Sequence, residues 1–515
     1  MSQNVVKWSY NIFSEKGGLS VQVKDNNGRP VNVTMLVITL VTGVFITVLN
    51  QTILATAFPT LMKAFNISTA TVQWLTTGFL MVNGIMIPVS AYLSAKVPTK
   101  WLYITAMSTF ELGTVVAFLS NSFPMLLTAR LIQALGVGVT MPLLQNIMLS
   151  IFPMEKRGTA MGIAGIAIGV APAIGPTLSG YVIDNFGWRT LFGMIIPVAA
   201  LVLVASFFFM RNVLPNTNPT IDVPSLAEST LGFGALLYGF SEVGNKGWGD
   251  PVVLASIALG AVVMALFARR QLHLKNPFVQ IRVFKNHVFT LSTILASISN
   301  MAMVGAEMVI PLYLQIIHGK SAFESGLTLL PGALLIALMS PVTGAVFDRI
   351  GARRLAQLGL FLLTIATIPY AFITATTPSI YITVLYAVRM FGVSMVQMPL
   401  TTNGMNALSG EMIRHGTAVN NTVRQVATSM TTAIMVSVLT NVTNNAKPAA
   451  SLLKLDPLAY KHDFFNATLS GYHAAFWIAT GFSAVGWILA FFLNKKQRSH
   501  DVDVAEMKED KEAAE

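Results

Sequence analysis

The chain has 515 residues, of which 54% are hydrophobic and only 11% are charged. Soluble domains carry about 25% charged residues, so this composition excludes an ordinary soluble enzyme and indicates a membrane protein. The absence of cysteine excludes a disulfide scaffold, a thiolate metal site and a cysteine nucleophile. A net charge of +11 is typical of a membrane protein with basic cytoplasmic loops, and we expect no nucleic-acid partner.

Hydropathy and loop breaks predict about 14 transmembrane helices, because one span needs roughly 20 apolar residues. The loops between them are too short to hold a sizeable soluble domain. We therefore expect an all-α integral membrane protein. In chain order, the predicted spans are residues 34–58, 74–95, 101–120, 125–149, 160–182, 189–210, 226–244, 251–268, 288–314, 323–347, 355–375, 379–401, 416–440 and 472–493.

Two similar loops suggest an internal repeat. Residues 88–100 close the second span and residues 341–354 close the tenth, and both segments begin Pro-Val and end in a basic turn. Because transporters built from parallel repeats carry such a loop in each half, we expect two pseudo-symmetric six-helix bundles plus an inserted helix pair. The predicted domains are an N-terminal tail (1–33), a first bundle (34–211), the inserted pair with a basic loop (212–287), a second bundle (288–494) and a C-terminal tail (495–515).

The distribution of lysine and arginine predicts the orientation. If the N-terminus is cytoplasmic, the tails and even-numbered loops hold most of these residues, which predicts that both termini are cytoplasmic. No apolar run precedes the first span, so we expect no cleavable signal peptide. Within the tail, the alternation of residues 19–24 and the turn at 26–28 are a weak hairpin signal, and a flexible or surface-lying tail is the alternative.

Ionisable side chains inside the predicted spans are candidates for proton coupling, because a charge in the membrane is costly. Glu307 lies in the ninth span, where burial favours the neutral carboxyl that a proton carrier needs, and Glu111 lies in the middle of the third. Arg130, in the fourth span, stays charged and would act on a neighbouring acid or on the substrate. Structural roles are the alternative for all three. A polar stretch at residues 420–425 should face protein or water rather than lipid.

The fifth span is the most distinctive segment, because glycines and prolines repeat along it. Glycines at such spacing allow another helix to approach closely, and prolines bend a helix and free its carbonyl groups. An ordinary packing face of small residues is the alternative. The residues that carry the pattern are Gly165, Gly169, Pro172, Gly175, Pro176 and Gly180.

These segments resemble motifs of the major facilitator drug exporters. Residues 172–180 resemble the antiporter motif, and residues 130–136 resemble the fourth-helix motif, with Ala134 where glycine is usual. Together with residues 188–192 and the span count, they resemble the 14-helix drug:proton antiporter family of the EmrB/QacA type, and residues 49–53 are most similar to its lincomycin-resistance (LmrB-like) branch. Residues 344–354 resemble the cytoplasmic loop motif of the family. The residues that carry this resemblance are Gly344, Asp348, Arg349, Gly351, Arg353 and Arg354.

The resemblance implies proton-driven efflux of amphipathic or cationic drugs by alternating access, with lincosamides among the candidate substrates. It implies small lipophilic drugs and protons as ligands, no cofactor, and a monomer in the lipid bilayer of the bacterial cytoplasmic membrane. The first and fourth helices of each half would line a central cavity, to which Glu307 would also contribute. The other expected lining residues are Asn50, Gln51, Thr52, Gln133, Asn146, Asn300, Met301, Gln315, Arg389, Gln397 and Asn403.

The sequence departs from the family pattern at two places. Many relatives have aspartate where Asn50 stands, so coupling here would rest on another acid such as Glu307 or Glu111. The first-half loop has Ala95 and Pro98 where the motif has aspartate and glycine, so a cytoplasmic latch would depend mainly on Asp348 and its arginines.

Two other functions stay open. One is proton-coupled export of a single endogenous metabolite, lipid or peptide, which only a panel of substrates would distinguish from drug export. The other is a membrane-embedded transferase. The sequence has no large polar loop and no metal or Walker lysine motif, which disfavours the transferase and an ATP-driven pump.

Overall fold

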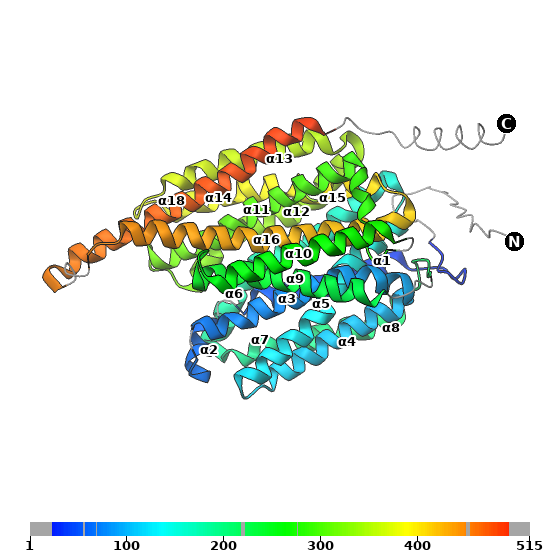
Figure 1. Cartoon of the computed structure of the whole chain (residues 1–515), viewed down its shortest axis with the longest axis horizontal. Helices are drawn as coiled ribbons and strands as arrows, with labels where there is room; N and C mark the ends of the chain where they lie inside the picture. Colours follow the sequence, from blue (N-terminus) through cyan, green and yellow to red (C-terminus); the bar gives the residue numbers. More distant parts are fainter. Residues whose placement is uncertain are drawn as a thin grey trace.

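The computed structural model describes residues 23–54, 57–67, 69–217, 222–274, 277–449 and 454–493. Long helices run side by side through the molecule (Figure 1). In the part of the chain just given, thirteen helical segments are long and apolar enough to cross a membrane. The predicted seventh span, 226–244, is not among the thirteen. It lies within helix α9 (Val223–Lys246), which has the length of a span but carries three charged residues.

The first bundle extends from residue 33 to residue 209. Its helix α1 begins, and the last helix of the chain ends, at the same end of the molecule, which we call the terminal face (Figure 1). We call the other end the opposite face. The elements are α1 (Val33–Thr52), α2 (Phe58–Phe65), α3 (Thr69–Lys96), α4 (Thr99–Phe118), α5 (Phe123–Ile151), η2 (Met154–Lys156), α6 (Arg157–Phe186), α7 (Arg189–Gly193) and α8 (Ile195–Phe209).

The inserted pair and the second bundle follow. The pair consists of α9 and α10 (Pro251–His273) and leads into the short helix η3 (Ile281–Lys285). The second bundle contains α11 (His287–Ile316), α12 (Ala322–Ile350), α13 (Ala352–Thr367), η4 (Ile368–Phe372), α14 (Ser379–Ser394), α15 (Gln397–Asn406), α16 (Gly410–Ala446), α18 (Pro457–Leu489) and η5 (Ala490–Phe492).

Polar side chains fix where several of the long helices begin. Asn32 accepts a hydrogen bond from the Met35 amide at the start of α1, and Asn286 does the same for two amides at the start of α11. Ser321 and Glu324 form a reciprocal capping box at the start of α12. Each cap satisfies backbone donors that the first turn of a helix leaves free, so the sequence determines the boundary locally.

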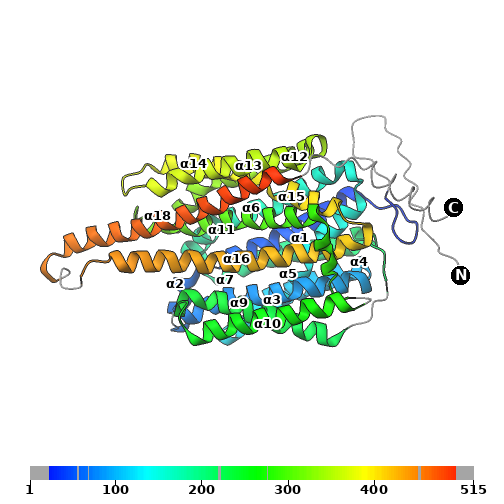
Figure 2. The ribbon, with the colours of Figure 1, turned by 45° about the horizontal axis from the view of Figure 1, so that its top comes forward.

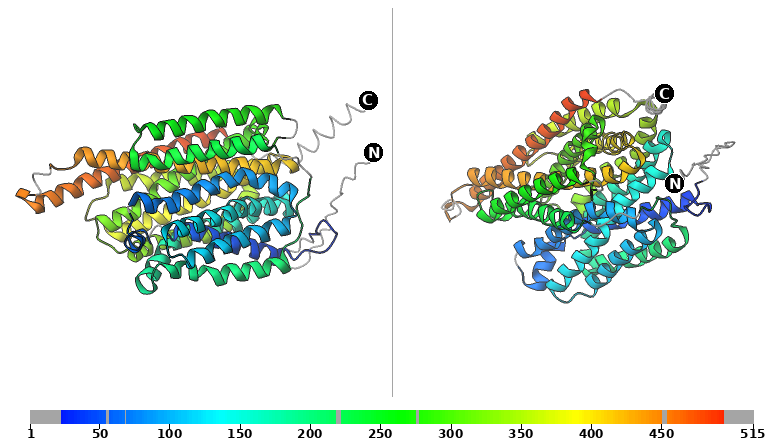
Figure 3. Two further views of the ribbon diagram at one scale, coloured as in Figure 1. Left: turned by 60° about the horizontal axis from the view of Figure 1, so that its bottom comes forward. Right: turned by 45° about the vertical axis from the view of Figure 1, so that its right-hand side comes forward.

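The buried hydrophobic residues form two large clusters. One is built mainly by the first bundle and extends to residues of α11, α15 and α16, and the other belongs to the second bundle. The inserted pair lies against one side of both bundles (Figures 2 and 3). Helix α9 contacts α3 of the first bundle and α16 of the second. The Thr77 hydroxyl on α3 and the Ser241 hydroxyl on α9 are 2.7 Å apart, and Val436 of α16 packs against Gly244 of α9. The pair therefore bridges the two bundles.

The segment before α1 forms a small turn, as the hairpin signal predicts for its second half. Lys24 and Pro30 make an isolated antiparallel bridge, and the Val31 amide donates to the Val23 carbonyl at 2.8 Å. Asn26 donates to the carbonyls of Asn212 and Leu214, which fixes the turn to the loop after α8. Residues 19–22 of the predicted hairpin lie outside the described residues.

The ends of several helices differ from the predicted spans. Helix α1 ends at Thr52, six residues before the predicted end of the first span. A separate helix α2 begins at Phe58, with Pro59 in its first turn, where a missing amide proton removes no hydrogen bond of the helix. Helices α16 and α18 are 37 and 33 residues long. At 1.5 Å per residue such helices exceed the roughly 30 Å hydrocarbon core, and their ends project beyond the opposite face (Figure 1).

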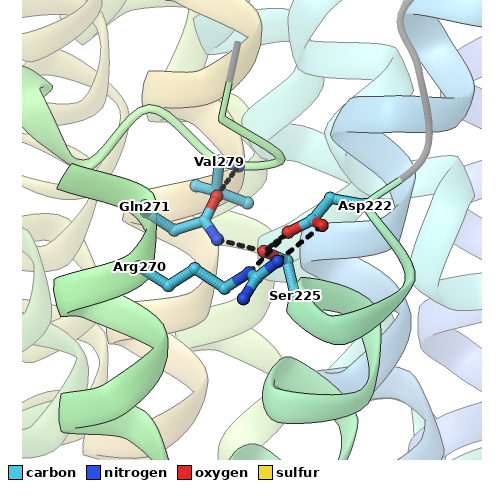
Figure 4. A network of polar contacts seen from close by, with 5 residues as sticks. All are labelled: Asp222, Ser225, Arg270, Gln271 and Val279. Atoms are coloured by element: carbon cyan, nitrogen blue, oxygen red, sulfur yellow. Dashed lines mark hydrogen bonds and ion pairs between the residues drawn. The ribbon is translucent and has the colours of Figure 1, made fainter. Parts of the chain in front are cut away.

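A polar network joins the two inserted helices near the terminal face (Figure 4). Arg270 donates to both carboxylate oxygens of Asp222, at 2.7 and 2.9 Å. Ser225 donates to the same carboxylate, Gln271 donates to Ser225, and the amide of Val279 donates to Gln271. The hydrogen bonds with Arg270 lower the pKa of Asp222 from its ordinary 3.8 to about 2.

Asp222→Asn is expected to lower the free energy of unfolding by about 1 kcal/mol, because it removes a bidentate but partly exposed ion pair. A lowered pKa means that the carboxylate stabilises the fold above pH 3.8 and loses this effect only as the pH falls through about 2. Thermal unfolding in detergent should therefore show the same deficit at pH 7 and pH 4. The double variant with Arg270→Gln should lose no more than either single variant, and a fully additive loss would contradict the pairing.

Candidate functional site

A cavity of about 340 Å³ lies between the two bundles, near the middle of the long helices. Ligand pockets in proteins occupy about 300–1,000 Å³, so the volume suits a small organic molecule. The lining residues are Thr47, Val48, Gln51, Thr52, Asn83, Ile87, Val137, Gly138, Met141, Pro142, Gly165, Ile168, Gly169, Pro172, Asn300, Met303, Val304, Glu307, Ile336, Ser340, Val393, Ser394, Gln397, Met398, Asn421, Arg424, Gln425 and Thr428.

The cavity wall combines a largely apolar surface with a few polar groups. Three methionines, Met141, Met303 and Met398, belong to it. Their flexible thioethers adapt to ligands of different shape. Glu307 is the acidic lining residue, and Arg424 is the basic one. Such a wall can hold amphipathic molecules and interact with a charge on them.

The structure places only part of the predicted lining at the cavity. Gln51, Thr52, Asn300, Gln397 and Glu307 belong to the wall. The prediction also included residues that do not reach the cavity, because their side chains are buried between helices or lie near a helix end. The residues that the cavity wall does not include are Asn50, Gln133, Asn146, Met301, Gln315, Arg389 and Asn403.

Arg130 is fully buried behind the wall, in a cluster that includes Asn50 and Gln133. Its Nη1 donates to the Gln133 side-chain oxygen at 2.8 Å and to the Asn50 carbonyl at 3.3 Å. Gln133 in turn donates to the Thr114 hydroxyl, and the guanidinium lies 4.2 Å from the centre of the Phe79 ring. Arg130 thus ties α5 to α1, α3 and α4. This arrangement corrects the expectation that Asn50 and Gln133 face the substrate.

Arg389 holds the corresponding position in the second bundle. It is also fully buried, and it donates to the Ala302 carbonyl of α11 and to the Thr367 hydroxyl of α13, both at 2.9 Å. The helices α11, α13 and α14 correspond by chain order to α1, α4 and α5. Each arginine therefore links the fourth helix of its half to the first and third helices, Arg389 directly and Arg130 partly through Gln133, which is a structural echo of the repeat.

Glu307 joins this second cluster to the cavity. It lies on α11 at the cavity wall, accepts a side-chain hydrogen bond from Tyr386 of α14, and lies close to the Arg389 charge. Glu111 is different, because it lies on α4 outside the cavity wall and its buried Oε2 has no hydrogen-bond partner. Of the two predicted coupling acids, the structure brings only Glu307 to the cavity.

The glycine-rich motif of α6 forms a close seam with α12. A Cβ on Gly162 would come within 2.4 Å of the Ser340 carbonyl, and one on Gly169 within 2.9 Å of Ile336. Gly165, Gly169 and Pro172 also line the cavity, while Gly175 packs against Thr52 of α1. The motif therefore lies where the two bundles meet, and both its glycine and proline positions border the cavity.

The loop motif closes the same seam at the terminal face. Both carboxylate oxygens of Asp348, at the end of α12, accept hydrogen bonds from the first turn of α6. The donors are the Gly158 amide at 2.8 Å and the amide and hydroxyl of Thr159 at 2.9 and 2.7 Å. An anion is stabilised at a helix N-terminus by the free amides and the helix dipole. This contact, which we call the Asp348 latch, joins the two bundles.

Other members of the loop motif shape the latch or flank it. Gly351 ends α12 with φ 79°, a conformation that favours glycine. Arg349 and Arg354 are exposed, and Arg353 is half-buried. A further hydrogen bond between the halves, from Arg157 to Asn406 at 3.0 Å, lies near the latch.

Gly344→Ala is expected to weaken the latch without touching the cavity, because its Cβ would lie 2.2 Å from the Gly158 carbonyl and the helices would have to separate. Overpacking of this kind costs about 1–3 kcal/mol. Thermal unfolding should show the loss, and limited proteolysis should cut the terminal face faster. Gly410→Ala, where nothing lies within 4 Å of the added carbon, is the control. Equal behaviour of the two variants would contradict the close seam.

The sequence reasoning missed one wall of the cavity. Asn421, Arg424, Gln425 and Thr428 on α16 line it, together with Asn83 on α3. The polar stretch at 420–425 was the available signal. The expectation that only the first and fourth helices of each half line the cavity left this stretch out of the predicted wall.

Comparison with known proteins places the chain in a family. A sequence profile of the Major Facilitator Superfamily matches residues 40–432. The chain is 45% identical to the MFS-type transporter YcnB of Bacillus subtilis (strain 168), over 91% of this chain and 97% of YcnB. It is 39% identical to the lincomycin resistance protein LmrB of the same bacterium, over 90% of this chain and 96% of LmrB.

A solved structure supports the fold. The human organic anion transporter MFSD10 (TETRAN) aligns with a TM-score of 0.61 at 14% identity, over 89% of this chain and 99% of that chain. The chain belongs to the major facilitator superfamily and, within it, to the drug:proton antiporter family that its motifs resemble. The predicted all-α fold is confirmed. Fold and family are those of a transporter, and the protein is a multi-pass bacterial membrane protein.

Proposed function

We propose that the protein exports amphipathic drugs in exchange for protons, with its terminal face towards the cytoplasm. The observation that carries the proposal is the cavity between the bundles, where Glu307 stands on an otherwise largely apolar wall. A carboxyl in such a place can exist as a neutral acid or as an anion, and only the anion attracts a cationic group. Protonation of Glu307 and binding of a cationic drug can therefore each weaken the other.

The exchange follows from this opposition. A proton that enters from the opposite face neutralises Glu307 and weakens the hold on a cationic or polar drug, which leaves. When the cavity then opens to the terminal face, the proton dissociates and the next drug binds. The gradient drives the cycle because the two ligands have different affinities for the two conformations. Tyr386 and Arg389 position the carboxylate, since the first donates a hydrogen bond and the second supplies a nearby positive charge.

Alternating access needs a contact that forms in one conformation and breaks in the other. The Asp348 latch has this character, because it joins the bundles at the terminal face and lies outside the cavity wall. The orientation rests on the excess of lysine and arginine in the tails and in the loops at the terminal face, which favours the cytoplasmic side. The similarity to LmrB makes lincosamides the first drugs to test.

The test uses purified protein in liposomes that contain a pH-sensitive dye, with an imposed pH gradient. Lincomycin, ethidium and a neutral lipophilic drug are added in turn, and protein-free liposomes and a protonophore serve as controls. The proposal expects drug-dependent proton movement with more than one of the three. Proton movement with none of them, in protein shown to be folded, would contradict drug export and favour a single endogenous substrate. Drug accumulation that ignores the pH gradient would contradict antiport.

A further inference from the structure

Arg424 is a buried cation at the cavity wall that has hardly any protein partner. The residue lies on α16 and is 9% exposed. Its Nη2 donates one long hydrogen bond, of 3.4 Å, to the side-chain oxygen of Asn300. Its Nε and Nη1 are buried and have no hydrogen-bond partner, and the ion pairs found among the described residues do not include Arg424. A buried guanidinium left in this state costs free energy unless something else satisfies it.

Two fully buried intramembrane arginines behave differently. Arg130 and Arg389 each donate to at least two protein acceptors within a closed cluster, and neither lines the cavity. Each of them leaves one nitrogen unpaired, whereas Arg424 leaves two. Arg130 and Arg389 brace helices, but Arg424 has its unused donors at the boundary of an open space.

The surroundings of Arg424 are rich in donors and poor in negative charge. The neighbouring side chain, Gln425, also lines the cavity and has a buried Nε2 without a partner. Asn300, which accepts from Arg424, must also accept from Gln397 at 3.4 Å. Glu307, the carboxylate of the wall, has Tyr386 and Arg389 as its partners instead. This corner of the cavity therefore presents unpaired donors and one uncompensated positive charge.

We propose that Arg424 binds an anionic oxygen group, such as a carboxylate or sulfonate, carried by an amphipathic substrate. The inference rests on the proposed function and names a substrate class for the same cavity. A guanidinium with free N–H groups in a low-dielectric site is the side chain best suited to such an anion, and Gln425 can add a donor. The apolar wall then holds the rest of the molecule. The cavity consequently accepts acidic or zwitterionic amphipaths and not only cations.

The test measures binding rather than transport, so that it is independent of proton coupling. Three fluorescent probes share one dansyl group and differ in charge: dansylglycine is anionic, its methyl ester is neutral and dansylcadaverine is cationic. Fluorescence anisotropy with the purified full-length protein in a neutral detergent gives the dissociation constants. The absence of added lipid excludes a lipid headgroup as the bound anion. Titration with sodium chloride shows whether a small inorganic anion occupies the same site.

Arg424→Gln should weaken the binding of dansylglycine at least tenfold (about 1.4 kcal/mol) and change the binding of the methyl ester less than about threefold. Arg424→Lys keeps the charge and should lose less than Arg424→Gln, because it keeps the attraction but not all the donors. Thr432→Val is the matched control. Thr432 lies about two turns further along α16, is exposed and does not line the cavity, so all three probes should bind this variant as they bind the wild type.

Two other results of the binding experiment would contradict the inference. If Arg424→Gln weakens ester and anion equally, Arg424 only shapes the cavity. If the wild type binds the ester as tightly as the anion, or chloride displaces dansylglycine completely, Arg424 does not recognise a substrate anion. Drug-dependent proton movement in liposomes with no anion preference would overturn this inference and leave the proposed function in place. A preserved anion preference without drug-dependent proton movement would overturn the proposed function and leave this inference in place.

Discussion

Glu307→Gln is expected to abolish drug-dependent proton movement in liposomes while the protein stays folded and still binds neutral drugs. Glutamine has the shape of a protonated glutamate but cannot release the proton, so it holds the cavity in its protonated state. Binding of cationic drugs should weaken by about tenfold or more, because the attracting charge is lost in a low-dielectric site. The measurement is the internal pH of liposomes after addition of ethidium or of a neutral drug.

The control for this variant is Glu111→Gln. Both residues are intramembrane glutamates, but Glu111 lies on α4 outside the cavity wall. The Glu111 variant should therefore retain drug-dependent proton movement. If Glu307→Gln keeps normal coupling and Glu111→Gln loses it, the site would have to be reassigned to α4. Loss of coupling in both would indicate that the assay responds to stability, which thermal unfolding of each variant would reveal.

Asp348→Asn is expected to slow transport about tenfold or more with little change in drug affinity. The carboxylate accepts three hydrogen bonds from the first turn of α6. The asparagine side chain keeps one acceptor oxygen, but its NH2 group faces N–H donors of α6 and cannot accept their hydrogen bonds. Hydrogen bonds to a charged group are worth about 1.5–3 kcal/mol, so the equilibrium between conformations should shift by roughly 10–100-fold towards an open terminal face.

Two measurements separate this effect from a loss of binding. Turnover in liposomes and drug affinity in detergent should change independently, since Asp348 does not line the cavity. Because the chain contains no cysteine, a single Ser394→Cys in the cavity wall can report access from the terminal face by its rate of thiol labelling. Asp348→Asn should raise that rate. Asp184→Asn, an exposed aspartate near the other end of α6, should not, and equal labelling in both would contradict the latch.

The general architecture could be predicted because it depends on local properties of the sequence. Runs of apolar residues determine the spans, and residues such as Asn32 and Ser321 determine where helices begin. The latch could be anticipated in part from the charged pattern around Asp348. What the sequence alone could not provide was its partner, because the amides of Gly158 and Thr159 carry no side-chain signal.

The cavity was harder to predict, because its wall depends on how far each helix is rotated. Asn50 and Gln51 are neighbours on α1, yet Gln51 faces the cavity and Asn50 joins the buried cluster of Arg130. Intramembrane position alone does not separate these roles either. Arg130 and Arg424 are similarly costly residues in the membrane, but the first finds protein partners and the second faces the cavity. Only the packing of several helices decides between them.

The most direct test of the central claim is proton release on drug binding. Purified protein in a weakly buffered detergent solution is titrated with ethidium, and a pH indicator counts the protons released. If drug and proton oppose each other at Glu307, the wild type releases protons as drug binds, and Glu307→Gln binds ethidium weakly with no release. Tight drug binding without proton release in the wild type, or equal release in the variant, would contradict proton-coupled export through this cavity.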